Sequence, residues 1–357
     1  MIFSIWISAI TIQIVITIFL SMQFARKGKE VVSNPVSLSV VVAARNELEN
    51  LKKLIPALLS QSHLDFEIII ALDRCSDRSG EFLRNQDLLK IKIIEIDETP
   101  EGWDHKKYAL TKGVEAANGT WIVFTDADCM PASKKWLNRL NDRIAADSKI
   151  LLGYSPYKSN GTLLQTFIQF EGFLTAFNYL SMALLKKPYM GVGRNLAVKR
   201  SFFLESSGYS DFRSVVGGDD DLFIQKNANA KNTQIYIGYE SLVFTEGKEK
   251  WAEYISQKTR HLSVGGAYSL FDRLLHLLFG GSLLLVWALL PFISVENILP
   301  IFAFYLLIKS IGYRFAHSKM GVGFNYIWLP LVELMYAVFL PIIALRSKLV
   351  KDIRWKN

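Results

Sequence analysis

Cysteine is scarce in this chain, because its 357 residues include only Cys75 and Cys129. Two cysteines imply no disulfide framework, so a reducing compartment is acceptable for the protein. Charge is missing altogether from residues 1–24, a stretch that is long enough to cross a bilayer. The same stretch lacks a basic n-region and a small-residue cleavage site, which favours an uncleaved membrane anchor over a signal peptide.

Half of the residues are hydrophobic, and the apolar ones are concentrated at the two ends of the chain. The net charge of +8 would suit nucleic-acid binding, but the basic residues cluster at the edges of apolar segments. The positive-inside rule and attraction to anionic lipids produce such placement, so we expect membrane lipids as partners and no nucleic acid. The basic residues concerned are Arg26, Lys27, Lys29, Arg346, Lys348, Lys351, Arg354 and Lys356.

Further apolar segments near the C-terminus are candidate spans. Four spans would put the basic tail, residues 346–357, on the side opposite to the basic residues that follow the first anchor. Three spans with one re-entrant or in-plane segment would keep both in the cytoplasm. We favour the second topology, because Glu333 and two prolines make the last segment the least ordinary helix. The membrane-associated part is residues 273–345, with candidate spans at 277–295, 298–313 (which carries Lys309) and 326–345.

Between the anchors, residues 33–272 alternate strand and helix patterns. Apolar runs rich in β-branched residues indicate buried strands, and segments with helical periodicity separate them. This alternation with short connections predicts an α/β domain with a mainly parallel sheet, covered by helices on both faces. The expected strands are 38–43, 67–72, 91–96 and 121–125, and the expected helices are 49–60 and 106–117.

Two carboxylates, Asp126 and Asp128, follow the predicted strand 121–125. Open α/β sheets bind ligands outside the carboxyl ends of their strands. The two carboxylates would repel each other unless a positive charge lies between them, and a divalent cation that carries phosphate oxygens meets that need. The pair is therefore a candidate metal–diphosphate site. The alternative is a turn whose carboxylates cap the next helix, from Pro131 onward.

Acidic or amide-bearing loops also follow the two preceding strands. The first expected strand is followed by Ala44, Arg45, Asn46 and Glu47, and the second by Asp73. Each loop by itself could be a helix cap, but three of them at one sheet edge are a less common coincidence. The carboxylates are suited to accept hydrogen bonds from a nucleobase and a ribose.

Several motifs in this order resemble a membrane-bound glycosyltransferase of family 2 with the GT-A fold, which is Rossmann-like with a mainly parallel sheet. The resemblance covers residues 38–261, and it rests on the order and spacing of the motifs rather than on any one of them. The motifs are residues 41–47 (VVAARNE), 73–77, 106–113, 126–128, 217–223 (GGDDDLF) and 257–261 (QKTRH).

The resemblance implies that Ala44, Glu47 and Asp73 contact uridine or guanosine. It implies further that Lys106 or Lys107 approaches the diphosphate of a nucleotide sugar. In the acidic pair, Asp128 would meet a Mg²⁺ or Mn²⁺ ion, and Asp126 would lie near the ribose or the sugar.

A third acidic cluster, Asp219 to Asp221, suits the catalytic base. Inverting transfer needs a base to take the proton of the acceptor hydroxyl, and a carboxylate among other carboxylates tends to have a raised pKa. The family pattern makes Asp219 the base, but Gly218 stands where a glutamate is common, which leaves Asp220 as an alternative. Without the resemblance, the cluster reads equally well as a solvated turn or the N-cap of a helix from Leu222.

The loop with Gly193, Arg194 and Asn195 resembles the acceptor-side loop of the family, although it is also compatible with an ordinary glycine turn.

The late motif with Gln257 resembles the Gln-x-x-Arg-Trp motif of processive polysaccharide synthases. Arg260 would neutralise the departing diphosphate. His261 replaces the tryptophan that would stack on an acceptor sugar, which counts against processivity. His261 would instead touch phosphate or cap a helix near the membrane.

The apolar segment 162–185 is interrupted by polar residues, so we expect an amphipathic helix that packs on the core or lies at the bilayer interface. The sequence as a whole predicts an integral membrane protein of a cell membrane with a cytoplasmic, metal-dependent, inverting glycosyltransferase domain. The expected partners are a UDP- or GDP-sugar donor and a lipid-linked or glycan acceptor. A processive polysaccharide synthase and a catalytically inactive membrane scaffold are the alternatives.

Overall fold

The computed structural model describes residues 1–26, 35–86 and 89–350. Lys27, Lys29, Lys351, Arg354 and Lys356 lie outside the described residues. The chain divides into two compact units. The sheet unit contains the described residues of 35–158 and 186–246. The helical unit contains residues 1–26, 159–185 and 247–350.

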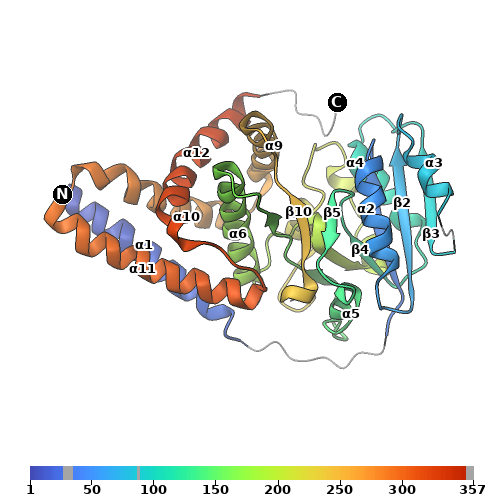
Figure 1. The fold of residues 1–357 in the computed structure, drawn as a ribbon, viewed down its shortest axis with the longest axis horizontal. Helices are drawn as coiled ribbons and strands as arrows, with labels where there is room; N and C mark the ends of the chain where they lie inside the picture. The colour runs from blue at the N-terminus through green and yellow to red at the C-terminus, as the bar shows by residue number, and fades with distance from the viewer. Residues whose placement is uncertain (27–34, 87–88, 351–357) are drawn as a thin grey trace. The chain divides into compact units, whose positions relative to one another are not determined.

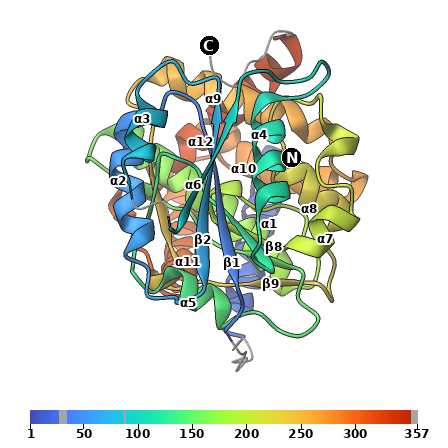
Figure 2. The ribbon, with the colours of Figure 1, turned by 90° about the vertical axis from the view of Figure 1, so that its right-hand side faces the viewer.

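The sheet unit is built on a seven-stranded sheet with the order β3-β2-β1-β4-β8-β6-β9 (Figures 1 and 2). β1, β2, β3 and β4 pair in parallel, whereas β8 is antiparallel to both of its neighbours, and β9 is again parallel to β6. The strands are β1 (Leu38–Ala44), β2 (Phe66–Asp73), β3 (Ile91–Ile96), β4 (Trp121–Phe124), β6 (Ile150–Leu152), β8 (Leu196–Lys199) and β9 (Thr233–Ile235). A second sheet has the order β5-β10-β7, with β5 (Cys129–Pro131), β7 (Tyr157–Lys158) and β10 (Val243–Glu246).

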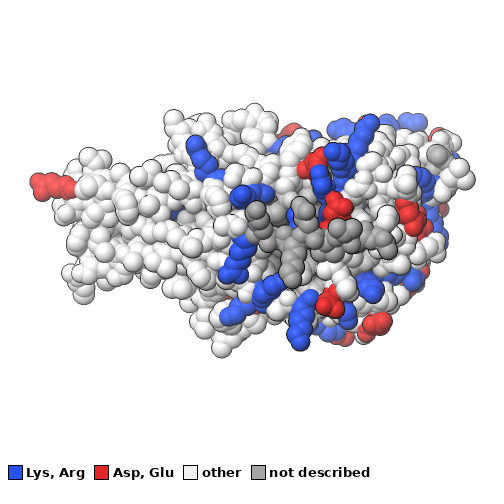
Figure 3. Space-filling view, turned by 90° about the horizontal axis from the view of Figure 1, so that it is seen from below, with Lys and Arg blue, Asp and Glu red and all other residues white. Residues whose placement is uncertain are grey.

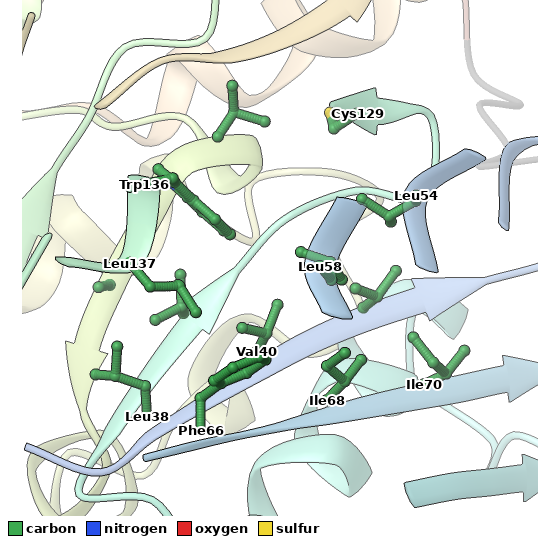
Figure 4. Close-up of a cluster of buried hydrophobic side chains, with 14 of the residues drawn as sticks. Leu38, Val40, Leu54, Leu58, Phe66, Ile68, Ile70, Cys129, Trp136 and Leu137 are labelled. Atoms are coloured by element: carbon green, nitrogen blue, oxygen red, sulfur yellow. The ribbon is translucent and has the colours of Figure 1, made fainter. Parts of the chain in front are cut away.

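Helices cover both faces of the main sheet, as the apolar runs of its strands require. On one face, Val40 and Ile68 belong to an apolar core that includes Leu54 and Leu58 of α2 and Trp136 of α5 (Figure 4). α4 packs on the other face, where a Cβ on its Gly113 would lie 2.5 Å from a Val41 methyl carbon. The helices are α2 (Leu48–Leu59), α3 (Ser79–Arg84), α4 (His105–Ala116), α5 (Trp136–Asn141), α7 (Arg200–Glu205) and α8 (Asp221–Asn227). The predicted α/β domain with a mainly parallel sheet is confirmed.

The helical unit contains α1, α6, α9, α10, α11 and α12. Among the described residues, four helical segments are long and apolar enough to cross a membrane: Ile2–Gln23, Leu270–Phe292, Val295–Met320 and Tyr326–Leu349. Candidate membrane helices near both chain ends are therefore confirmed, and the third is longer than the predicted 298–313. The helices are α1 (Ile2–Gln23), α6 (Leu163–Leu184), α9 (Trp251–Ser263), α10 (Leu270–Leu289), α11 (Val295–Met320) and α12 (Leu329–Leu349).

A helix forms at the predicted 162–185 as α6, but it is not amphipathic, because residues on nearly all of its sides are buried. Its Phe170, Phe173 and Phe177 surround the ring of Tyr313, with centroids 5.3 to 6.4 Å away. In the structure, segments 159–185 and 247–272 cluster with the membrane helices, while the domain boundaries 33–272 and 273–345 stay predictions.

Candidate active site

The predicted acidic loops meet at one edge of the main sheet. Since β1, β2 and β4 are parallel neighbours, their carboxyl ends lie together. β1 ends at Ala44, β2 ends at Asp73, and β4 is followed by Asp126 and Asp128. This edge is where an open α/β sheet holds its ligands.

Asp126, Asp128 and Cys129 bring one potential ligand atom each within 4.8 Å of one another. Desolvation by the surrounding atoms and the Asp126 carboxylate raise the pKa of Asp128, although solvent still reaches part of its surface. A cation between the two carboxylates would relieve this repulsion. Burial raises the pKa of the Cys129 thiol well above its ordinary range, so it stays protonated. Hard cations such as Mg²⁺ prefer oxygen, so the two aspartates fit a divalent metal and the thiol does not take part.

Lys106 joins two of the acidic loops. Its Nζ lies 3.0 Å from Asp126 Oδ1 and 3.0 Å from Asp219 Oδ2. Burial opposes the charge of this lysine, but the carboxylates of Asp126, Asp219 and Asp220 raise its pKa well above the ordinary value. Lys106 is therefore a permanent positive charge between the metal-binding candidate and the candidate base.

The neighbouring Lys107 has a different role, because its side chain is fully buried. Its Nζ donates to the carbonyl oxygens of Val215 and Gly217, the latter at 2.5 Å. Asp104 caps α4 by accepting from the Lys107 N–H at 3.1 Å, and its own N–H donates to the Arg213 carbonyl. Lys107 thus fixes the loop before Asp219, and it would have to leave two carbonyls to approach a diphosphate.

The candidate base Asp219 and its neighbour Asp220 are held differently. Both carboxylate oxygens of Asp220 accept backbone N–H groups, from Gly193 at 2.7 Å and from Asp221 at 2.9 Å, so Asp220 caps α8. Asp219 contributes to a small hollow that also contains Asp126. Of the two, Asp219 is the one that lines the hollow beside Asp126, although it is the more buried residue.

The expectation of a raised pKa at the base is wrong for Asp219. Burial would raise its pKa, but Lys106 and Lys107 outweigh this effect and lower it. For Asp220 the expectation holds, because burial and the Asp219 carboxylate raise its pKa. The difference arises because both Lys106 and Lys107 lower the pKa of Asp219, whereas Asp220 lies beside the Asp219 carboxylate.

The hollow includes a residue that sequence reasoning missed. Tyr209 is buried, and it lines the hollow together with Leu110, Phe124, Thr125, Asp126, Gly193, Leu196 and Asp219. Nothing in the local pattern around Tyr209 distinguishes it from an ordinary core aromatic. Gly193 lies at the edge, where a Cβ would come 3.3 Å from Asp219 Oδ2.

The two residues that follow Gly193 point to different surroundings. Arg194 donates to the Tyr157 hydroxyl at 2.8 Å, and its guanidinium lies 4.7 Å from that ring's centroid. Asn195 is fully buried, and its Nδ2 donates to the carbonyls of Tyr154 at 2.7 Å and Ser241 at 2.9 Å. To contact a substrate, Asn195 would have to give up these hydrogen bonds. Arg194 lies beside the acidic pair, where its positive charge partly offsets the rise in the pKa of Asp128.

The candidate nucleotide loops are braced by their own side chains. Asn46 and Arg74 adopt positive φ values of 54° and 45°, and Asn46 Oδ1 accepts the Ser76 N–H at 2.8 Å. The buried Asp73 pairs with Arg74 at 2.8 Å. Glu47 accepts from Asn50 at 2.5 Å at the start of α2. A nucleoside that uses Asp73 or Glu47 would compete with these contacts.

Gln257, Arg260 and His261 lie on α9 in the helical unit, not in the sheet unit. Their predicted contact with the diphosphate stays a prediction, as do the substrate roles of Ala44, Glu47 and Asp73.

An open α/β sheet with converging carboxylates at its carboxyl edge is the architecture of a ligand-binding α/β domain, and comparisons with known proteins identify the family that it resembles. The model of the family Glycosyl transferase family 2 matches residues 39–204. The 4,4'-diaponeurosporenoate glycosyltransferase of Staphylococcus aureus (strain USA300) is 23% identical over 250 residues, which cover 67% of this chain and 64% of that protein. The match thus spans less than two thirds of that relative's length.

Among solved structures, the mannosyltransferase PcManGT from Pyrobaculum calidifontis, in complex with GDP-Man and Mn²⁺, shares the fold. The TM-score is 0.61 with 14% identity, over 99% of this chain and 100% of the other. Residues 39–204 are therefore similar to glycosyltransferase family 2, the fold is GT-A-like, and the predicted resemblance is confirmed.

Proposed function

We propose that this protein transfers a sugar from a nucleotide-diphosphate donor to a hydroxyl acceptor, with inversion at the anomeric carbon. The observation that carries the proposal is the convergence of Asp126, Asp128 and Asp219 with Lys106 at the carboxyl edge of the sheet. These carboxylates come from two loops far apart in the sequence. A purely structural role would not require two of them to share one lysine beside a hollow.

Asp128 and Asp126 would hold a Mg²⁺ or Mn²⁺ ion. Such an ion, when bound, neutralises the diphosphate leaving group of a nucleotide sugar. GDP-Man and Mn²⁺ in the structural neighbour support this donor class and a divalent metal. Lys106 and Arg194 would add positive charge beside the same phosphates, Lys106 from α4 and Arg194 from the loop before β8.

Asp219 would act as the base. Its pairing with Lys106 lowers its pKa and keeps it ionised at neutral pH, so the carboxylate is always available to accept the acceptor's proton. As the acceptor oxygen attacks the anomeric carbon, the proton moves to Asp219 and the bond to the diphosphate breaks. Asp220 would serve by capping α8 and fixing the direction of Asp219.

The acceptor would be lipid-linked or a glycan, and the catalytic domain would lie in the cytoplasm. Candidate membrane helices near both chain ends support a membrane location. Basic residues beside them, Arg26 and Arg273, support a cytoplasmic sheet unit by the positive-inside rule.

The test is release of free nucleoside diphosphate by the detergent-purified protein across a panel of UDP- and GDP-sugars, with a lipid extract as acceptor. Each donor is assayed with Mn²⁺, with Mg²⁺ and with chelator. We expect release from one donor, sensitive to chelator and abolished by Asp128→Ala. Asp147→Ala, which removes an exposed aspartate away from the site, is the matched control and should retain full release.

If no donor in the panel releases nucleoside diphosphate, this would contradict the proposal and favour the inactive scaffold. Release that survives both chelator and Asp128→Ala would contradict the metal site alone. Product length separates single transfer, which we expect, from a processive synthase.

A further inference from the structure

The described part of the helical unit contains six α-helices, and an enclosed polar cluster joins four of them. Gln13 of α1 donates to the Phe279 carbonyl at 2.7 Å and to Ser282 Oγ at 2.8 Å, both on α10. It accepts from Lys309 Nζ of α11 at 2.9 Å. Lys309 also pairs with Glu333 of α12. These contacts put the middle of α1, α10 and α11 at one common depth, with Glu333 beside it.

α1, α10 and α11 run alongside one another. Trp6 donates to the Val286 carbonyl at 3.0 Å, and Gln13 meets Phe279, so α1 and α10 are antiparallel. A Cβ on Gly312 would lie 2.8 Å from Ser21 Oγ, and with the Gln13–Lys309 contact this makes α1 and α11 parallel.

Basic residues therefore share one end of these three helices. They are Arg26 after α1, Arg273 in the first turn of α10 and Lys319 in the last turn of α11. The opposite end includes Glu296. Figure 3 shows the same asymmetry, with a broad uncharged surface that ends in one acidic side chain.

α12 does not continue this pattern. Glu333 accepts from Tyr305 at 2.7 Å, and a Cβ on Gly280 would lie 3.7 Å from a Leu340 methyl group. Gly280 is next to Phe279, so Leu340 lies at nearly the same depth as Glu333. Seven residues of helix are about 10 Å long. If α12 were a fourth span, Glu333 and Leu340 would differ in depth by that length. Instead α12 crosses the other helices, as Figure 1 shows by its steep angle to α11.

The inner face of α12 packs on two other helices of the same unit. Tyr336 contacts Phe170 of α6, with centroids 6.4 Å apart, and Phe339 lies 5.7 Å from Phe167. Phe339 also stacks on Trp251 of α9 at 5.3 Å. α12 is thus antiparallel to α6. Phe170 also contacts Tyr313, which lies one helical turn from Lys309 toward the basic end of α11, so this face of α12 packs in the basic half of the unit.

The outer face of α12 carries an unbroken apolar stripe. Its residues recur at helical spacing, they are all exposed, and each keeps between 38% and 72% of its surface accessible. Arg346 and Lys348 end the stripe. The members of the stripe are Leu331, Leu334, Val338, Ile342, Leu345 and Leu349.

We propose that the membrane part has three spans, α1, α10 and α11, and that α12 lies along the leaflet on their basic side. The outer stripe enters the acyl chains of that leaflet, and Arg346 and Lys348 meet anionic headgroups. The three spans also expose many large apolar side chains, which is the reason to assign the stripe to lipid rather than to a protein partner. The C-terminal end of α12 then lies on the same side as Arg26.

The first test measures depth in vesicles of phosphatidylcholine and phosphatidylglycerol. Nitroxide labels are placed on Leu334→Cys, Val338→Cys and Leu345→Cys, all on the exposed stripe of the full-length protein. We expect nearly equal depths in the acyl region. A span would spread the labels by about 16 Å between residues 334 and 345, and that spread would overturn the proposal. Labels that stay in water would overturn it as well.

The second test uses an impermeant maleimide applied to either side of sealed vesicles. Lys348→Cys should be labelled from the same side as Arg26→Cys, and Glu296→Cys only from the other side. Labelling of Lys348→Cys together with Glu296→Cys would make α12 a fourth span. The parent protein, with Cys75 and the buried Cys129, sets the background. Neither test depends on enzymatic activity, so neither fails with the proposed function.

Discussion

Two of the protein's lysine–carboxylate clusters, one around Lys309 and one around Lys106, differ in how completely they are enclosed. In the helical unit, Lys309 and Glu333 have no exposed side-chain surface. In the sheet unit, Asp126 keeps 31% and Asp219 keeps 11% of the side-chain surface exposed around Lys106.

Enclosure decides what each cluster is able to do. Lys309 has Gln13, Tyr305 and Glu333 as partners and no open side, so its ion pair is suited to holding helices in register. The two aspartates that Lys106 contacts, Asp126 and Asp219, line a hollow, so their carboxylates are open to a ligand. A lysine–carboxylate pair is therefore structural in one unit and accessible to ligands in the other.

The largest expected effect is on the open cluster. Asp219→Asn removes the proton acceptor, so we expect kcat to fall by about 10²–10⁴-fold. Donor affinity, measured by calorimetry with the metal present, should change little because the amide keeps the shape of the side chain. Asp147→Asn is the control. Full turnover by Asp219→Asn would move the base to another residue.

Substitutions in the enclosed cluster should lower the stability of the protein rather than its turnover. Lys309→Met leaves Glu333 buried without its cation, which should cost about 3–5 kcal/mol in unfolding free energy. The double variant Lys309→Met/Glu333→Leu removes both charges and should recover most of that loss. Thermal unfolding in detergent measures both, with the exposed Lys319→Met as control. A single variant as stable as the parent would show that the pair does not hold α12.

Lys106→Met tests the link between the lysine and the base. Asp219 must be ionised to accept a proton, and Lys106 lowers its pKa. Without the lysine the pKa of Asp219 rises, so activity should be lost at a higher pH as the solution is acidified. The pH profile of kcat measures this shift, with Lys112→Met on the same helix as control. An unchanged acidic limb would contradict the pairing.

The smallest effect is expected at Asp220. Asp220→Ala removes the N-cap of α8 and should cost about 0.5–2 kcal/mol, whereas Asp220→Asn keeps a good cap and should cost less. Denaturation of the two variants side by side measures the difference. If Asp220→Asn abolishes turnover while its stability is intact, then Asp220 is the base and the assignment of Asp219 fails.

Much of the sheet unit could be predicted from periodicity. Strands such as 38–43 and 121–125 read as buried apolar runs, and parallel order brings their carboxyl ends to one edge, so Asp126 and Asp128 could be singled out. The pattern could not separate Lys106 from Lys107, because adjacent helical residues point about 100° apart and only packing decides which of them meets the carboxylates. Tyr209 gave no signal because its local pattern is that of an ordinary core aromatic.

The sequence by itself determined what is local: an α/β alternation, the acidic loops after three strands, and the apolar segments at both ends. These depend on residue type and spacing along a single element. Tertiary structure decided which carboxylate faces a lysine, that Asp220 caps a helix while Asp219 does not, and in which direction α12 runs. Those outcomes depend on contacts between segments far apart in the chain, such as Lys106 with Asp219 and Gln13 with Lys309, which no local pattern encodes.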